Sequence, residues 1–279
     1  MKIIVVGKGG VGKTTIAAGL ALMLSDTGCN VILVDADSTP NTACSLGIPI
    51  EDALRITPLI RNYSLIEERT GAKPGEGWGI LFSLTPRVDD IIDEYGISVR
   101  KNLKLIVLGN ITSGNQGCMC PAIALARQLL RHMLLGRDEA VIVDSSAGAE
   151  DLGRGLAEHF DILIAVSEPL PRSIMIALKM IEMGQDLNVG STVLVVNKVR
   201  SLSRTLRLCR RLVPQEVPVV LIGYDENVVA AEEMGKGLDS LDPSSPLMRG
   251  LGEIIRRFIP LYPSRSSCFL KARESARGV

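Results

Sequence analysis

The sequence predicts an α/β fold with a mostly parallel central sheet flanked by helices on both faces. Three observations support this fold class. Short β-branched runs alternate with longer helical patterns, the short runs are apolar without interruption, and aromatic residues make up only 3% of 279 residues. Unbroken apolar runs are expected where both faces of a strand are covered. The repeated order of strand and helix therefore favours parallel strands with right-handed crossovers around an aliphatic core.

The same patterns predict where the elements lie along the chain. Strands are expected at Lys2–Gly7, Val31–Asp37, Leu103–Gly109, Ala140–Ser145, Asp161–Ser167, Thr192–Lys198 and Pro218–Tyr224. Helices are expected around Thr15–Leu24, Ile123–Leu135, Ser173–Met183, Ser203–Leu212 and Asn227–Met234. The least regular stretch, residues 53–101, is interpreted as an elaborated functional loop or a tolerated insertion. We expect a single domain over residues 1–259 and a frayed basic tail over residues 260–279.

Composition excludes several classes of protein. Lys plus Arg equals Asp plus Glu at 31 each, so no overall positive field draws the chain onto nucleic acid. No stretch approaches the ~20 apolar residues of a membrane helix, and the N-terminal sequence does not resemble a signal peptide. Six cysteines without an export signal suggest thiols, metal ligands or core packing rather than disulfides. We therefore expect a cytoplasmic protein with neither nucleic acid nor membrane as a partner.

A glycine-rich segment identifies a phosphate-binding loop. Residues 7–14 read Gly-Lys-Gly-Gly-Val-Gly-Lys-Thr, which matches the pattern Gly-x-x-x-x-Gly-Lys-Ser/Thr between an expected strand and an expected helix. Its backbone N–H groups would surround phosphate oxygens, Lys13 would reach the β- and γ-phosphates, and the Thr14 hydroxyl would hold Mg²⁺. The expected nucleotide-binding residues here are Gly7, Gly9, Gly10, Val11, Gly12, Lys13, Thr14 and Thr15. The sequence thus predicts a P-loop NTPase that binds MgATP.

A second lysine in this loop, Lys8, is similar to the signature of the deviant Walker A class. That class includes MinD, ParA, the nitrogenase iron protein and several metallochaperones. The resemblance implies a homodimer in which Lys8 reaches the partner's phosphates. There it would neutralise charge on the transferred phosphoryl group, as an arginine finger does. Hydrolysis of ATP to ADP and phosphate would then be coupled to the dimer state.

Further polar residues follow the ends of later strands, where α/β sheets bind ligands. The resemblance implies that Asp37 orients or activates the attacking water, so Lys8, Lys13 and Asp37 are the expected catalytic residues. It also implies that Asp35 and Asp144 support the Mg²⁺ held by Thr14. The remaining expected nucleotide contacts are the Gly148 amide, which would sense the γ-phosphate, Asn197, which would read adenine, and the adjacent Lys198.

Two thiols form a second constellation, Gly117-Cys118-Met119-Cys120-Pro121. Side chains two apart do not share a helix face, and we expect Cys118 and Cys120 to bind one ion from a loop. Pro121 is expected to begin a helix whose positive end favours the metal-binding thiolate. Two ligands do not complete a structural zinc site, whereas a two-fold dimer would supply the second pair. A redox dithiol, a buried thiol pair without a role, and iron–sulfur ligands remain alternatives.

The chain resembles the CooC-type ATPases, which assist nickel insertion into carbon monoxide dehydrogenase. The resemblance covers nearly all of residues 1–240 and includes Lys8, the thiol element, the stretch at residues 77–86 and the sequence after Asp144. It implies Ni²⁺, or Zn²⁺ as a substitute, bound between two subunits by Cys118 and Cys120 of each. The implied client is a nickel enzyme, either carbon monoxide dehydrogenase or acetyl-CoA synthase.

Two other functions compete with this interpretation. An iron–sulfur carrier or reductase of the nitrogenase iron protein type would need a cysteine near the second switch, and Asp144–Arg154 contains none. A MinD- or ParA-like positioning ATPase would explain neither Cys118 nor Cys120.

Overall fold

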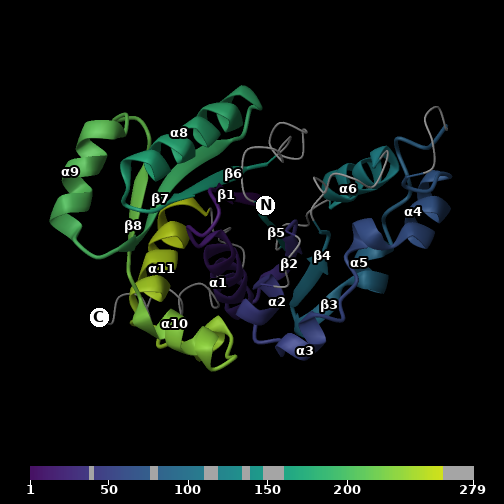
Figure 1. Cartoon of the computed structure of the whole chain (residues 1–279), viewed down its shortest axis with the longest axis horizontal. Coiled ribbons are helices and arrows are strands. Elements are labelled where there is room, and N and C mark those ends of the chain that lie inside the picture. The colour runs from purple at the N-terminus through teal and green to yellow at the C-terminus, as the bar shows by residue number, and fades with distance from the viewer. Residues whose placement is uncertain (38–40, 76–80, 110–118, 134–138, 147–159, 260–279) are drawn as a thin grey trace.

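The structure is a computed structural model that describes residues 1–37, 41–75, 81–109, 119–133, 139–146 and 160–259. Within these residues, eight strands form one sheet in the order β3-β4-β2-β5-β1-β6-β7-β8 (Figure 1). The strands are β1 (Lys2–Gly7), β2 (Asn30–Asp35), β3 (Ile97–Arg100), β4 (Leu103–Val107), β5 (Glu139–Asp144), β6 (Ile162–Ser167), β7 (Ser191–Val199) and β8 (Val219–Gly223). All neighbours pair in parallel except β3 and β4. The mostly parallel sheet and all of the expected strands are confirmed.

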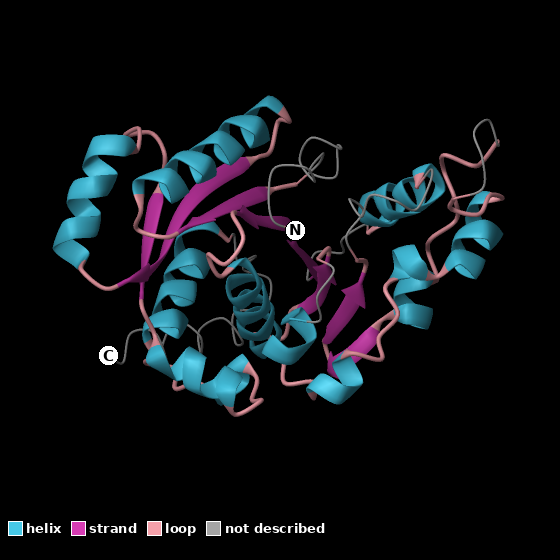
Figure 2. Ribbon diagram, viewed as in Figure 1, coloured by secondary structure: helices cyan, strands magenta, loops and turns pink. Residues whose placement is uncertain are grey.

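Helices cover both faces of this sheet (Figure 2). Side chains of β1 alternate between the two resulting cores, with Ile3 and Val5 in one and Ile4 and Val6 in the other. The first core is completed by α1 (Lys13–Asp26), α2 (Asn41–Ser45), α3 (Ile50–Ala53), α10 (Glu226–Glu233) and α11 (Pro246–Phe258). The second is completed by α4 (Tyr63–Thr70), α5 (Ile91–Tyr95), α6 (Cys120–His132), α8 (Pro171–Asp186) and α9 (Leu202–Leu212). Burial on both faces explains why the strands read as unbroken apolar runs.

The edge strand β3 was not expected from the sequence. Ile97–Arg100 lies within residues 53–101, the least regular stretch of the sequence, and none of its residues is fully buried. It therefore lacks the apolar run that marks the central strands. It is held by antiparallel pairing with β4, a contact that only the folded chain supplies. Three helices and a 3₁₀ turn (Leu59–Arg61) also lie between residues 50 and 95, so the described part of this stretch is structured.

The last helix, α11, was not among the helices expected from the sequence. The helix begins at Pro246, and its buried residues include Leu247, Leu251, Ile254 and Ile255, which lie on one face. The Ser245 hydroxyl accepts a hydrogen bond from the Met248 N–H at 3.4 Å and caps the helix. Leu251 is fully buried and lies against Gly19 of α1, which has no side chain to keep the two helices apart.

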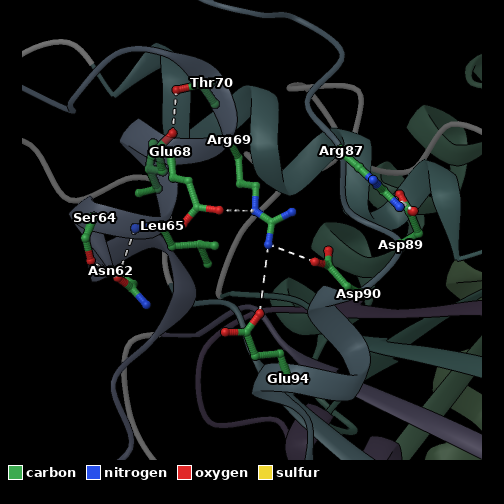
Figure 3. A network of polar contacts seen from close by, with 11 residues as sticks. Asn62, Ser64, Leu65, Glu68, Arg69, Thr70, Arg87, Asp89, Asp90 and Glu94 are labelled. Atoms are coloured by element: carbon green, nitrogen blue, oxygen red, sulfur yellow. Dashed lines mark hydrogen bonds and ion pairs between the residues drawn. The ribbon is translucent and has the colours of Figure 1, made fainter.

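Arg69 joins the short helices α4 and α5 at the β3–β4 end of the sheet (Figure 3). Arg69 of α4 places Nη2 2.9 Å from Oδ2 of Asp90 and Nε 3.5 Å from Oε1 of Glu68, and Glu94 of α5 lies 3.9 Å away. Only 13% of the Arg69 side chain is exposed, whereas the three carboxylates are 49–69% exposed, so solvent still screens these ion pairs. Because α4 also contacts α6, the network supports the helix that starts at Cys120.

Among the described residues, no helix is both long and apolar enough to cross a lipid bilayer.

Replacing Leu251 by alanine is expected to open a cavity between α11 and α1. The loss of buried apolar contacts should lower the free energy of unfolding by about 2–5 kcal/mol, measured by urea unfolding. Met234→Ala is the matched control, because 68% of Met234 is exposed, and its effect should stay within about 0.5 kcal/mol. Equal stabilities for the two variants would contradict the packing of α11 described above.

Candidate functional site

The parallel strands bring the residues expected at the site to one edge of the sheet. Gly7 ends β1, Asp35 ends β2 and Asp144 ends β5. In the strand register, Asp144 lies opposite both Val5 and Asp35. Asn197 lies near the end of β7 on the same edge, because β1, β6 and β7 are all parallel. Residues separated by more than 100 positions in the sequence therefore meet beside the phosphate loop.

The phosphate loop connects β1 to α1, as expected. Gly10 and Gly12 adopt φ angles of 79° and 98°, in the left-handed region that favours glycine. A side chain at Gly12 would also collide with Nδ2 of Asn197. Helix α1 begins at Lys13, whose side chain is buried, and its first turn carries no acidic residue to oppose an anion. Lys8, in contrast, is exposed on the loop.

The Asp35 and Asp144 carboxylates are fully buried beside this loop. Oδ1 of Asp35 accepts a hydrogen bond from the Asp37 N–H at 2.9 Å, and Oδ2 of Asp144 accepts one from the Thr42 hydroxyl at 3.2 Å. The other oxygen of each carboxylate is buried without a hydrogen-bond partner in the described part of the chain. Unpartnered buried carboxylate oxygens are costly, and hard cations such as Mg²⁺ prefer such ligands. The donor set at this edge therefore fits a magnesium ion.

Burial also shifts the protonation of both carboxyls. It raises the pKa of Asp35 to about 7, against the opposing hydrogen bond from the Asp37 N–H. It raises the pKa of Asp144 to about 6, against the opposing effects of the Thr14 hydrogen bond and the Lys13 charge. A cation placed between these groups would favour their charged forms.

The end of β7 contacts the outer side of the phosphate loop. Nδ2 of Asn197 donates to the Val11 carbonyl oxygen at 2.9 Å, and Nζ of Lys198 donates to the Gly10 carbonyl oxygen at 2.6 Å. Nζ of Lys198 also lies 3.4 Å from Oε1 of Glu168, which directly follows β6. The structure thus places both expected nucleotide contacts of β7 on the loop itself.

The thiol element is described in part. Cys120 is exposed in the first turn of α6, Met119 is the N-cap residue, and Pro121 lies in the first turn, which confirms the expected helix start. Because α6 leads from β4 to the parallel strand β5, its first turn lies at the nucleotide edge of the sheet. Cys118 and Gly148 lie outside the described residues. Within those residues, no group of three or more His, Cys, Asp or Glu side chains could hold a metal ion.

Two residues at this edge were missed by sequence reasoning. Thr42, which lies in α2, donates a hydrogen bond to Asp144. Glu168, which directly follows β6, pairs with Lys198. Glu168 follows an expected strand in the same way as the aspartates do, so its position could have drawn attention to it. No sequence signal connects Thr42 with Asp144, because the contact joins residues 102 positions apart.

The buried Asp35 carboxyl predicts a pH-dependent loss of stability in the absence of divalent cations. Its pKa is about 7 in the folded state against an ordinary value of 3.8. Between these values the folded state holds a proton that the unfolded state has lost, so the free energy of unfolding falls as the pH rises. Relative to Asp35→Asn, the wild type should therefore lose on the order of 4 kcal/mol between about pH 4 and pH 8.

Urea unfolding in a chelator at both pH values measures this difference, and millimolar Mg²⁺ should reduce it at the higher pH. Asp52→Asn is the control, because the Asp52 carboxylate is exposed and should show no comparable trend. The predicted linkage would be refuted if the difference in free energy of unfolding between the wild type and Asp35→Asn were the same at both pH values.

Comparison with known proteins agrees with this geometry. The family model of the CobQ/CobB/MinD/ParA nucleotide binding domain matches residues 2–238. An uncharacterized ATP-binding protein of Methanocaldococcus jannaschii is 41% identical over 242 residues, which cover 86% of this chain and 91% of that protein. The carbon monoxide dehydrogenase accessory protein CooC of Rhodospirillum rubrum is 37% identical over 255 residues, which cover 88% of this chain and 91% of that protein.

Solved structures give the same fold at lower identity. The MinD cell division protein of Aquifex aeolicus superimposes with a TM-score of 0.61 at 20% identity, covering 94% of this chain and 99% of that chain. A ParA family ATPase of Chlorobium tepidum gives a TM-score of 0.62 at 15% identity, covering 91% of this chain and 97% of that chain. At such identities the likeness concerns the fold alone, whereas the family model and the curated relatives cover most of the sequence. The chain therefore belongs to the CobQ/CobB/MinD/ParA family of P-loop ATP-binding ATPases.

Proposed function

We propose that this protein is an ATP-dependent metallochaperone that binds Ni²⁺ at a Cys-x-Cys site shared by two subunits and assists its insertion into a nickel enzyme. The observation that carries the proposal is the position of Cys120, which is exposed in the first turn of α6 at the nucleotide edge. The similarity to the carbon monoxide dehydrogenase accessory protein supports it further. Carbon monoxide dehydrogenase or acetyl-CoA synthase is the proposed client, and a reducing cytoplasm would keep the thiols available.

In this proposal the phosphate loop binds ATP through its backbone N–H groups. Lys13, buried at the start of α1, neutralises charge on the β- and γ-phosphates, and Asp37 orients the attacking water. Thr14, Asp35 and Asp144 would hold Mg²⁺, which supplies further neutralisation of charge on the phosphates. The unpartnered carboxylate oxygens support this assignment. Gly148 would respond to the γ-phosphate, and Asn197 and Lys198 complete the nucleotide-binding set.

Hydrolysis is proposed to depend on the dimer because of Lys8. Its side chain is exposed at the loop, whereas Lys13 is buried within its own subunit. Lys8 is therefore free to reach a second copy docked on this edge. An isologous dimer formed there would bring Cys118 and Cys120 of one chain toward those of the other, giving four thiolates for one ion. ATP binding would close the interface, and hydrolysis would loosen it and release the metal to the client.

The proposal predicts one metal ion per two chains. Anaerobic titration of the apoprotein with Ni²⁺ and with Zn²⁺, alongside molecular mass in solution with and without ATP, measures this stoichiometry. Cys118→Ala/Cys120→Ala should lose the metal and retain ATP binding, because the thiolates are its only proposed ligands. Cys29→Ala/Cys44→Ala removes two other thiols and should retain the metal.

Stoichiometric metal in the Cys118→Ala/Cys120→Ala variant would sink the proposed site. A wild-type protein that binds no metal in any nucleotide state would instead favour a positioning ATPase of the MinD or ParA type. Binding of an iron–sulfur cluster in place of Ni²⁺ would favour the carrier or reductase.

Lys8→Ala should retain ATP binding and lose turnover by about 10³-fold or more, because a trans cation stabilises charge only in the transition state. Phosphate release measured above the dimerisation concentration tests this expectation. Lys101→Ala is the control, since Lys101 is an exposed lysine in the turn between β3 and β4. Unchanged turnover in Lys8→Ala would remove the proposed trans role.

A further inference from the structure

The end of β7 departs from regular strand geometry where it meets the phosphate loop. The register between β7 and β8 shifts between Val196 and Val199, and Lys198 has a φ angle of 59°, in the left-handed region. Consecutive side chains of a regular strand point to opposite faces. Here Asn197 and Lys198 both reach the loop, with Nδ2 and Nζ on two consecutive carbonyl oxygens. An irregularity of this kind re-aims a side chain, and uncommon backbone conformations are concentrated at functional sites.

These contacts determine which way the loop amides face. In a planar trans peptide, the carbonyl of one residue and the N–H of the next point in opposite directions. Lys198 draws the Gly10 carbonyl outward, so the Val11 N–H points inward. In the same way, Asn197 draws the Val11 carbonyl outward, so the Gly12 N–H points inward.

The Gly12 carbonyl continues this pattern, because it accepts the Ile16 N–H at 3.1 Å as the first hydrogen bond of α1. Three consecutive carbonyls are therefore held from outside. In the described part of the chain, no hydrogen bond uses the N–H groups of Val11, Gly12 or Lys13. These donors are left for an anion.

We propose that Lys198 and Asn197 are positioning residues that preorganise the phosphate loop by holding the Gly10 and Val11 carbonyls. Glu168 assists by keeping Lys198 in place, since Oε1 lies 3.4 Å from Nζ. Their principal effect is then on the binding of polyphosphate, whatever base the nucleotide carries. The inference rests on phosphate binding in the proposed function and not on its nickel site.

Inorganic tripolyphosphate separates this role from recognition of adenine, because it has no base. In the presence of Mg²⁺, Lys198→Met should lower the affinities for tripolyphosphate and for ATP by the same factor, about tenfold or more, as expected for one hydrogen bond from a charged donor. Lys198→Arg keeps a cationic donor and should restore most of both affinities. Asn197→Asp replaces the Nδ2 donor by an acceptor and should also weaken both ligands equally. Lys179→Met is the matched control, because it removes an exposed lysine paired with Glu182 at 2.8 Å on α8.

A second measurement separates positioning from direct contact with phosphate. In the nucleotide-free protein, the amide NMR signals of Val11 and Gly12 should shift in Lys198→Met and remain in place in Lys179→Met. Unchanged amide signals with a reduced affinity would mean that Lys198 contacts the phosphates directly, and would overturn the proposal. Loss of ATP affinity with normal tripolyphosphate affinity, or no loss for either ligand, would overturn it as well. A wild type that binds neither ligand would overturn the nucleotide site itself, whereas failure of the metal titration alone would end only the metallochaperone function.

Discussion

Parallel pairing of β1 with both β5 and β6 is the constraint on which the rest of the structure depends. It brings the carboxyl ends of three strands to one edge, so that the phosphate loop after Gly7 lies beside Asp144 and Ser167. Parallel strands need long crossovers, and these crossovers supply the helices on both faces. The helix starts and strand ends then meet at the same edge, where their N–H groups and carboxylates can act on one ligand.

The same edge carries an electrostatic cost. Two carboxylates, Asp35 and Asp144, are withdrawn from water on adjacent strands, and the nearby cation Lys13 compensates only in part. Burial raises the pKa of Asp35 to about 7 and that of Asp144 to about 6, so the folded protein favours the protonated form of each carboxyl more than the unfolded chain does. A divalent cation would reverse this preference. Folding and cation binding at this edge are therefore coupled, and a bound divalent cation would stabilise the folded protein.

The phosphate loop combines glycine flexibility with external support. Gly10 and Gly12 permit the left-handed turns, but freedom of the backbone alone would let the loop amides point in many directions. Contacts from the end of β7 and from α1 restrict the carbonyls and, through them, the N–H groups. At the opposite end of the sheet, the Arg69 network supports α4, which contacts the helix that carries Cys120. Both halves of the proposed function thus depend on contacts outside the motifs themselves.

The sequence by itself determined the central strands, the phosphate loop and the strand-end aspartates, because these depend on local signals. An apolar run buried on both faces, a glycine loop before a helix and a carboxylate after a strand can each be recognised within about ten residues. The start of α6 at Cys120 was predictable for the same reason, since Pro121 suits the first turn of a helix.

Only the tertiary structure decided which distant residues meet. The edge strand β3, the docking of Leu251 on α1 and the hydrogen bond of Thr42 to Asp144 depend on partners far away in the sequence. The position of Lys198 on the Gly10 carbonyl depends on a register shift and a left-handed backbone angle that its residue type does not favour. Such features arise when packing of the whole sheet overrides local preference, and a pattern of neighbouring residues carries no record of them.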